Sequence, residues 1–322
     1  MKKDKPEKTN KVEFGKTRSG QNKLAWLKRD WRLYAMLAVP IIWYILFCYK
    51  PMAGLVIAFQ KYNIFKGIKG SQFVGLENFK FVFGMRDFGI ALRNTLWLNL
   101  LDLIFGFPMP IVLAILLNEM RMKRVKKVSQ TLLYLPHFLS WVIIGGMVLK
   151  IFAPTTGAIN ATLMKWGWIE KNIPFMTDGG WWTFTYVLVG VWQGMGWGTI
   201  LYLAAITGLD STLFEAAEID GANKLQRIWH VTLPGIRSTI VVLLVLNIGR
   251  MMSIGFDRPY IIGNTLVKDA CDVISTFVYR AGIQNNQFAR ATAIGLFQSV
   301  VGVILITVAN AVSRKFDEQS IW

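Results

Sequence analysis

Apolar residues in this chain come in long blocks rather than at the spacing of an amphipathic helix or strand. Runs of about 20 apolar residues match the thickness of a bilayer core, where helices satisfy all their backbone polar groups internally. The alternating pattern of a membrane β-barrel is absent from the sequence. The pattern therefore predicts an all-α membrane protein, a polytopic bundle of about six transmembrane helices. The predicted spans are residues 33–59, 90–118, 129–153, 181–208, 236–256 and 289–312. Lys50 and Pro51 interrupt the first span, so a shorter span that ends near Tyr49 is an alternative.

Basic residues predict how this bundle is oriented. They concentrate before the first span and in the loop 119–128, and Arg314 and Lys315 follow the last span. With an even number of spans these segments lie on one side, and the positive-inside rule makes that side the cytoplasm. Both termini are therefore expected in the cytoplasm. The segments expected outside are 61–88, 154–180 and 257–288.

The pattern divides the chain into a tail, a membrane domain and a short C-terminus. Residues 1–32 are polar and basic, as in a loosely ordered cytoplasmic tail. The membrane domain is expected at 33–318, and 319–322 form a C-terminal tail. The first apolar run is too long for a signal peptide and lacks a small-residue cleavage site. A cleaved leader is therefore not expected.

A polar segment at 210–235 separates the fourth and fifth spans and lies on the predicted cytoplasmic side. Thr212 and Glu215 have the spacing of a capping box, which predicts the start of a short helix. Gly221 suits the left-handed residue that ends this helix, and Pro234 is expected to stop a second one. The pattern predicts a coupling element that docks into another protein.

Composition narrows the possible functions. The 322 residues are 53% hydrophobic with a mean hydropathy of +0.40, which excludes an ordinary soluble domain. The formal charge of +17 lies largely next to the membrane, where topology and anionic lipids explain it better than nucleic acid. Cys48 and Cys271 indicate neither a disulfide framework nor a metal site, and the isolated His137 and His230 are expected to be structural.

The sequence contains no nucleotide-binding motif of its own. Gly194, Gly196 and Gly198 superficially match a nucleotide loop, but they lie inside an apolar span and favour close helix packing. No cofactor is expected in this chain, so any energy source for its activity must come from another chain or an ion gradient.

The polar segment resembles the EAA loop of ATP-binding-cassette (ABC) importer permeases. The positions that match are Glu215, Ala216, Ala217, Asp220, Gly221, Ala222, Leu233 and Pro234. Residues 73–79 resemble the outer-loop hallmark of carbohydrate-uptake permeases of the maltose-transporter superfamily. Residues 255–257 and 293–299 resemble the LplB-like branch, associated with oligo- and polysaccharide importers of Gram-positive bacteria. The resemblance extends over nearly the whole chain from about residue 33.

The resemblance implies a permease subunit that translocates an oligosaccharide, including an acidic or polysaccharide-derived one, across a bacterial cell membrane. Its implied partners are a second homologous permease, two ATPase subunits that bind ATP and Mg²⁺, an extracellular solute-binding lipoprotein and membrane lipids. A permease for another small solute is an alternative. A membrane enzyme acting on lipid-linked sugars is a second, and it requires a nucleophile or paired carboxylates at a membrane face. Glu215, Glu218 and Asp220 lie there, but helix capping and packing already occupy two of them.

Polar residues inside the predicted spans are candidates for the substrate pathway, because such side chains face a cavity or one another. At about 1.5 Å per residue, several lie roughly 15–24 Å from the inner ends of their spans. The candidates are Gln193, Gly194, Trp197, Asn247, Arg250 and Asp102. The first three resemble the sugar-contacting stretch of a maltose-transporter permease.

Four of these candidates also have a structural alternative. Trp197 either stacks on a pyranose or packs against a neighbouring helix, and Asn247 either meets hydroxyls or bonds across a helix. Arg250 either pairs with Asp102 or faces the cavity, where it favours an acidic sugar such as a uronate.

Overall fold

The computed structural model describes residues 30–316, so the predicted C-terminal tail and nearly all of the N-terminal tail lie outside the described residues. The chain divides into two compact units, Met1–Gly54 and Leu55–Trp322. Helices dominate the described part of both units, and one antiparallel pair of two-residue strands accompanies them, β1 (Gln60–Lys61) with β2 (Gln72–Phe73).

The first predicted span is helical from Trp31 to Phe59 and does not end near Tyr49. It consists of α2 (Trp31–Tyr44), a π-helical turn (Ile45–Tyr49), α3 (Lys50–Met52) and a 3-10 segment (Ala53–Phe59). The π-helical turn shifts the hydrogen-bond register just before Pro51, whose ring and missing N–H do not suit an α-helix interior. This register shift lets the helix continue past the proline.

Three further helices are long and apolar enough to cross a membrane. They are Arg86–Glu119, α11 (Gly179–Thr207) and α19 (Phe288–Phe316). Arg86–Glu119 contains α6 (Arg86–Leu101), a π-helical turn (Asp102–Gly106) and α7 (Pro108–Glu119). They confirm the second, fourth and sixth predicted spans.

The third and fifth predicted spans are bent. α8 (Lys123–Tyr134) and a 3-10 turn (Leu135–Phe138) meet α9 (Trp141–Ile151) at 98°. The helical stretch Lys224–Gly235 meets α15 (Arg237–Gly249) at 61°. With each bent pair counted as one span, the described residues hold up to six spans, and otherwise four.

The outer end of the fifth prediction is wrong, because α15 ends at Gly249 and an irregular linker follows it. Side chains from other helices hold this linker instead of helical bonds. The amide of Asn99 donates to the carbonyl of Met251 at 2.8 Å, and the amide of Gln298 donates to the carbonyl of Met252. The apolar character of the linker therefore reflects tertiary burial, not a continuing helix.

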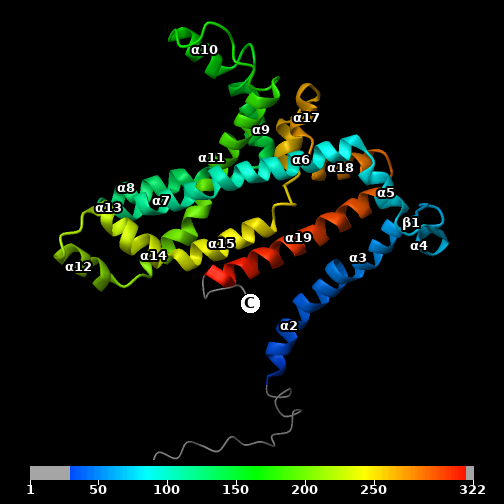
Figure 1. The fold of residues 1–322 in the computed structure, drawn as a ribbon, viewed down its shortest axis with the longest axis horizontal. Coiled ribbons are helices and arrows are strands. Elements are labelled where there is room, and N and C mark those ends of the chain that lie inside the picture. The colour runs from blue at the N-terminus through cyan, green and yellow to red at the C-terminus, as the bar shows by residue number, and fades with distance from the viewer. Residues whose placement is uncertain (1–29, 317–322) are drawn as a thin grey trace, which may run out of the picture. The chain divides into compact units, whose positions relative to one another are not determined.

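Close packing in the second unit depends on small residues. α11 packs along α7, and α15 lies beside α19 (Figure 1). A Cβ at Gly196 would lie 1.9 Å from the carbonyl oxygen of Leu133, and one at Gly198 would lie 2.8 Å from Pro110. These contacts confirm the packing role predicted for the glycine run, whereas Gly194 faces open space.

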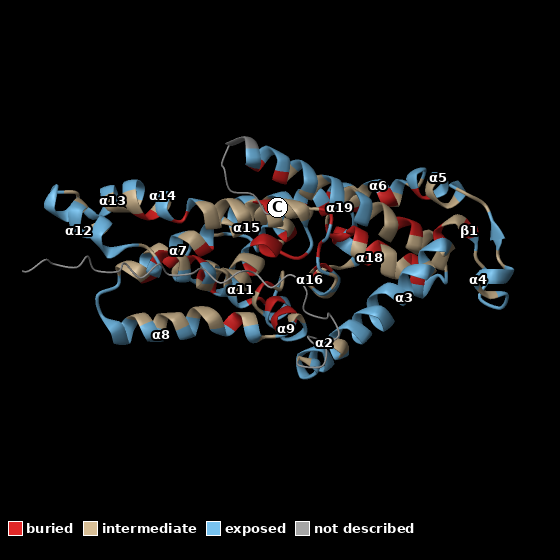
Figure 2. Cartoon of the chain, turned by 90° about the horizontal axis from the view of Figure 1, so that it is seen from below, coloured by how far each residue is buried: buried red, intermediate tan, exposed pale blue. Residues whose placement is uncertain are grey.

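Buried residues of the second unit follow the inner faces of its helices, and much of the outer surface is exposed (Figure 2). Many exposed residues are large and apolar, as a lipid-facing surface requires. Short helices connect the long ones. They are α4 (Gly67–Gly70), α5 (Glu77–Phe83), α10 (Ala158–Lys165), α16 (Asp257–Ile262), α17 (Lys268–Cys271) and α18 (Ile274–Tyr279).

Candidate functional site

The polar segment folds into an elbow of short helices at one end of the second unit, opposite α4 and α5 (Figure 1). Its elements are α12 (Ser211–Ile219), α13 (Lys224–Arg227), a π-helical turn (Ile228–Thr232) and α14 (Leu233–Gly235). The helix therefore runs one residue past Pro234 before the 61° bend, rather than stopping at it.

The predicted capping box of Thr212 and Glu215 is wrong. Asp210 caps α12 instead, and its carboxylate accepts a hydrogen bond from the Thr212 backbone N–H at 3.0 Å. Thr212 already lies within the helix, so its side chain has no capping position. Hydrogen bonds from Thr212 hold the pKa of Asp210 below its usual range. The capping box of the elbow lies at α13, between Asn223 and Gln226.

Gly221 adopts the predicted left-handed conformation, with a φ of 78°. The Ala222 N–H donates to the Ala217 carbonyl at 2.9 Å and the Gly221 N–H to the Glu218 carbonyl at 3.1 Å. This pair of bonds is a Schellman motif, which ends α12 and turns the chain. An ion pair of 3.1 Å between Glu218 and Arg227 then joins α12 to α13 across the turn.

The elbow exposes an apolar surface and a small-residue hollow. Leu213, Ile219, Leu225 and Trp229 are between 53% and 86% exposed. A hollow of about 280 Å³ is lined by Ala217, Asp220, Gly221, Ala222, Gln226, Arg227, His230 and Val231. Glu215 is exposed and has no ion pair within the described residues. The elbow therefore offers apolar, small and acidic groups on a rigid turn.

Asp102 pairs with Arg258, so the predicted alternative in which it pairs with Arg250 is wrong. Both carboxylate oxygens of Asp102 accept hydrogen bonds from the guanidinium of Arg258, at 2.8 and 3.1 Å. The guanidinium also donates to the carbonyl of Tyr186 and lies 3.5 Å from the centroid of its ring. A Cβ at Gly190 would lie 2.2 Å from the guanidinium, so this glycine makes room for the charge.

Sequence reasoning missed Arg258 because it lies in a loop predicted outside the membrane. In the structure, α16 packs against α9 and carries Arg258 to the face of α11. A carboxylate inside a span, such as Asp102, requires a cationic partner. The spacing of residues along the sequence did not show which cation this partner is. Arg250 follows the end of α15, is exposed and has no ion pair in the described part of the chain.

A polar cavity of about 220 Å³ lies beside this ion pair. Three glycines form much of its wall, and it brings Asp102 and Gly194 together from the predicted set. Its lining is Asp102, Gly106, Gly190, Val191, Gly194, Met195 and Arg258. Gln193 is half-buried beside Gly194 but does not line this cavity.

Trp197 packs against the bend of the third span, as its structural alternative predicted. Its ring stacks on His137 at a centroid distance of 4.6 Å and an angle of 7°, and Phe138 meets it edge-on. Trp197 nevertheless stays 48% exposed. Asn247 is exposed and donates to the Leu243 carbonyl of its own helix at 2.7 Å, so its predicted bond across helices is wrong.

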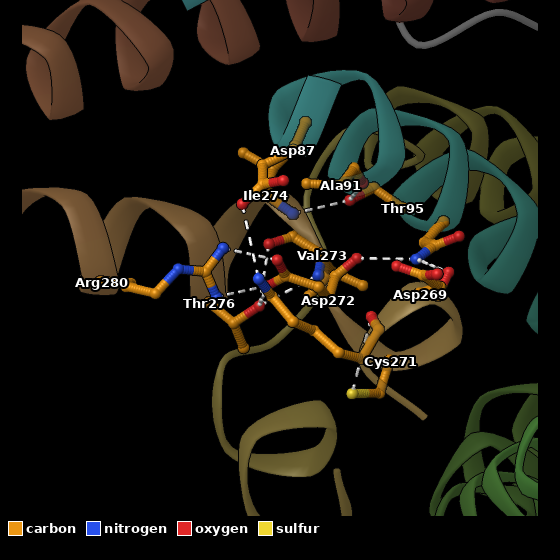
Figure 3. Close-up of polar contacts among 12 residues, drawn as sticks. Asp87, Ala91, Thr95, Asp269, Cys271, Asp272, Val273, Ile274, Thr276 and Arg280 are labelled. Carbon is orange, nitrogen blue, oxygen red and sulfur yellow. Dashed lines mark hydrogen bonds and ion pairs between the residues drawn. The ribbon is translucent and has the colours of Figure 1, made fainter. Parts of the chain in front are cut away.

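A second polar network ties α17 and α18 to α6 (Figure 3). The carboxylate of Asp272 is 4% exposed and accepts hydrogen bonds from Arg280 at 2.5 and 3.1 Å. The Ile274 N–H donates to the hydroxyl of Thr95, and the amide of Asn94 donates to the Asp272 carbonyl, both at 2.9 Å. The bond to Asp272 raises the pKa of Arg280. The network therefore fixes this loop rather than forming a reactive site.

Comparison with known proteins identifies the family. The model of the binding-protein-dependent transport system inner membrane component matches residues 106–318. The chain belongs to this family. Protein LplB of Bacillus subtilis is 43% identical over 299 residues, which cover 93% of each chain. The polygalacturonan/rhamnogalacturonan transport system permease protein YteP of the same organism is 44% identical and covers 90% of each chain.

Solved structures agree with this assignment. A crystal structure of a bacterial ABC transporter involved in the import of the acidic polysaccharide alginate is 40% identical, with a TM-score of 0.83. The match covers 91% of this chain and 98% of the other. A second structure, of a bacterial alginate ABC transporter in complex with alginate pentasaccharide-bound periplasmic protein, is 39% identical, with a TM-score of 0.84. The predicted importer-permease fold is confirmed, and this permease is a membrane transport component.

Proposed function

We propose that this permease translocates an oligosaccharide into the cytoplasm as part of an ABC importer. Its partners are a second homologous permease, two ATPase subunits and an extracellular solute-binding lipoprotein. The observation that carries the proposal is the 40% identity over 91% of the chain to a transporter subunit involved in alginate import. We further propose an acidic substrate, because that transporter is involved in the import of the acidic polysaccharide alginate and YteP belongs to a transport system for polygalacturonan and rhamnogalacturonan, whose galacturonate units carry carboxylates.

The elbow is the proposed contact with an ATPase. Its exposed apolar side chains suit burial in a groove of a partner, and the exposed Glu215 suits an ion pair with a basic residue there. Ala216 and Ala217 keep the intervening face slim, and the Schellman turn at Gly221 holds the angle. ATP-driven closure of the ATPases then moves the spans through this rigid turn.

The proposed pathway follows accessible polar and aromatic side chains. Trp197 and Asn247 are exposed in the single chain, and Gly194 opens onto the polar cavity. The Asp102–Arg258 pair is internally neutral, so it offers a sugar hydroxyl an acceptor and a donor without a net charge. Arg250 is the exposed cation at the outer end of α15 and suits a uronate carboxylate.

Co-purification and uptake test the proposal together. The tagged permease, expressed in the organism from which it comes, is expected to co-purify with a second permease and an ATPase. The assembled importer with its binding protein should import labelled alginate pentasaccharide faster than neutral maltopentaose. Equal uptake of both sugars would reject the acidic preference, and uptake of neither would reject oligosaccharide transport.

A further inference from the structure

The linker between α15 and α16 is tied to neighbouring helices, and buried and exposed residues alternate along it. The side-chain amides of Asn99 and Gln298 bond two of its carbonyls, as described above. Met252 and Ile254 are buried, whereas Ser253 and Gly255, which follow them in turn, are exposed. The linker therefore presents a defined surface that begins directly after Asn247 and Arg250.

Three aromatic rings meet at the outer end of this surface. Phe256 stacks on Tyr260 at a centroid distance of 4.6 Å, and Tyr279 of α18 lies 4.9 Å from Phe256 and 5.5 Å from Tyr260. Tyr260 is 48% exposed, and Phe256 and Tyr279 are partly exposed. Neither phenol hydroxyl makes a hydrogen bond within the described residues. We call these three residues the aromatic trio.

The opposite face of α16 is anchored in the bundle, which preorganises the aromatic trio. Arg258 is bound by Asp102 and Tyr186, and the indole N–H of Trp182 donates to the Ile262 carbonyl at 2.8 Å. Gly145 allows this approach, since a Cβ there would lie 2.2 Å from the side chain of Ile261. A ligand that meets the trio therefore meets rings already held in position.

We propose that the aromatic trio is a saccharide subsite that takes an outer pyranose ring of the oligosaccharide, which makes uptake dependent on chain length. The inference rests on the proposed function and adds a site outside the pathway residues named there. A pyranose presents an apolar C–H face to a ring, and the two phenol hydroxyls provide free donors and acceptors for its hydroxyl groups. The subsite follows Asn247 and Arg250 along the chain, at the end of the linker that leads from α15 into α16.

Two other roles make different demands on the same rings. Tyrosines at a membrane–water interface anchor a span, and an anchoring role affects insertion regardless of substrate. Packing against the second permease requires apolar volume but no aromatic face. Both roles predict effects that do not depend on the length of the sugar.

The test compares a short and a long sugar in the assembled importer. Uptake of alginate disaccharide and pentasaccharide is measured in proteoliposomes with the binding protein, and membrane abundance is measured for every variant. The double variant Y260A/Y279A is expected to lower the ratio of pentasaccharide uptake rate to disaccharide uptake rate by about two- to tenfold. This is the range expected for lost aromatic stacking. The double variant Y260F/Y279F keeps both rings, so its uptake ratio should stay close to that of the wild type.

Two controls make the result decisive. The pair Y260L and Y279L keeps apolar volume without an aromatic face, so a wild-type ratio in this variant would overturn the proposal. Trp166 and Trp168 form another exposed aromatic pair, with centroids 5.2 Å apart, and replacing both by alanine should leave the ratio unchanged. An equal loss for both sugars in Y260A/Y279A would also overturn it. A wild-type importer that takes up neither sugar rejects the proposed function itself.

Discussion

At the residue scale, the Asp102–Arg258 pair brings two opposite charges into a bundle that otherwise buries mainly apolar side chains. Burying a charge in a membrane protein is costly, and a partner with good geometry offsets that cost. Here the carboxylate binds the guanidinium through both oxygens, and the Tyr186 carbonyl and ring also contact the guanidinium. The pair thereby joins α16, α11 and the second span.

Removing one partner of this pair should destabilise the permease. Arg258→Met leaves the Asp102 carboxylate unmatched, which typically costs about 3–5 kcal/mol. We expect less folded protein in the membrane, and Asp102→Leu added to the same chain should restore much of it. Arg250→Met is the matched control, because the exposed Arg250 has no ion pair within the described residues. Equal abundance of both single variants, measured by fluorescence size-exclusion chromatography, would contradict a stabilising role.

Gly190 should tolerate a methyl group less well than Gly194, because Asp102 and the Tyr186 carbonyl hold the guanidinium that its Cβ would displace. The Cβ of Gly190→Ala would meet the Arg258 guanidinium at 2.2 Å, and forced overpacking typically costs about 1–3 kcal/mol. Nothing lies within 4 Å of a Cβ at Gly194, so Gly194→Ala should be neutral or slightly stabilising through its better helix propensity. Thermal unfolding of the two purified variants in detergent compares them directly. A lower midpoint for Gly194→Ala would argue against this packing description.

At the scale of elements, the elbow depends on one left-handed residue. Gly221→Pro removes the N–H that bonds the Glu218 carbonyl and fixes φ near −65°, so the Schellman turn cannot form. We expect normal insertion but ATP hydrolysis uncoupled from uptake. Gly221→Asn is the matched control, because asparagine tolerates this conformation and should retain most of the coupling. Coupled uptake by Gly221→Pro would reject the elbow as the transmitting element.

The start of α12 should loosen in acid. The pKa of Asp210 is lowered in the folded state, so its cap contributes fully above the ordinary value of 3.8. That contribution is lost as the pH falls through the lower folded pKa. Hydrogen exchange at the Thr212 amide should therefore accelerate, beyond its intrinsic pH dependence, in this acidic range. Asp210→Asn keeps a capping oxygen without the titration, so the same acceleration in that variant would refute the cause.

At the scale of the whole molecule, two predicted cytoplasmic segments lie at the same end of the second unit. Lys224 of the elbow lies 3.9 Å from Glu119 at the start of the 119–128 loop, while α4 and α5 lie at the opposite end (Figure 1). Opposite ends of a bundle emerge on opposite sides of a membrane. This placement agrees with the orientation expected from the positive-inside rule, which labelling can test.

Single cysteines should report this orientation. With both native cysteines replaced by alanine, a membrane-impermeant maleimide added to intact cells should label Lys69→Cys and Lys165→Cys but not Arg124→Cys. All three positions are exposed in the structure, so permeabilised cells should label each of them. Labelling of Arg124→Cys in intact cells would overturn the proposed topology.

Local physical rules account for what the sequence determined. Long apolar blocks identified the four continuous spans and the two bent helix pairs of the described residues, because a bilayer core demands such runs whatever surrounds them. Gly221 was recognisable because few other residues adopt its backbone conformation, and the acidic, alanine and glycine positions of the elbow identified the family. The cap was misplaced by two residues, since Asp210 and Thr212 are both good capping residues and only the observed hydrogen bond distinguishes them.

Only the tertiary structure decided which distant residues meet. Arg258 reaches Asp102 across 156 positions because α16 folds back onto α11 at a glycine, and no local spacing encodes that contact. The same holds for the linker after α15, whose carbonyls are bonded by Asn99 and Gln298 instead of by a continuing helix. Hydrophobic pattern and turn chemistry depend on residues close together in the chain, so both can be predicted from the sequence. Charge pairing and side-chain bonding act through space, so they follow from the packed bundle alone.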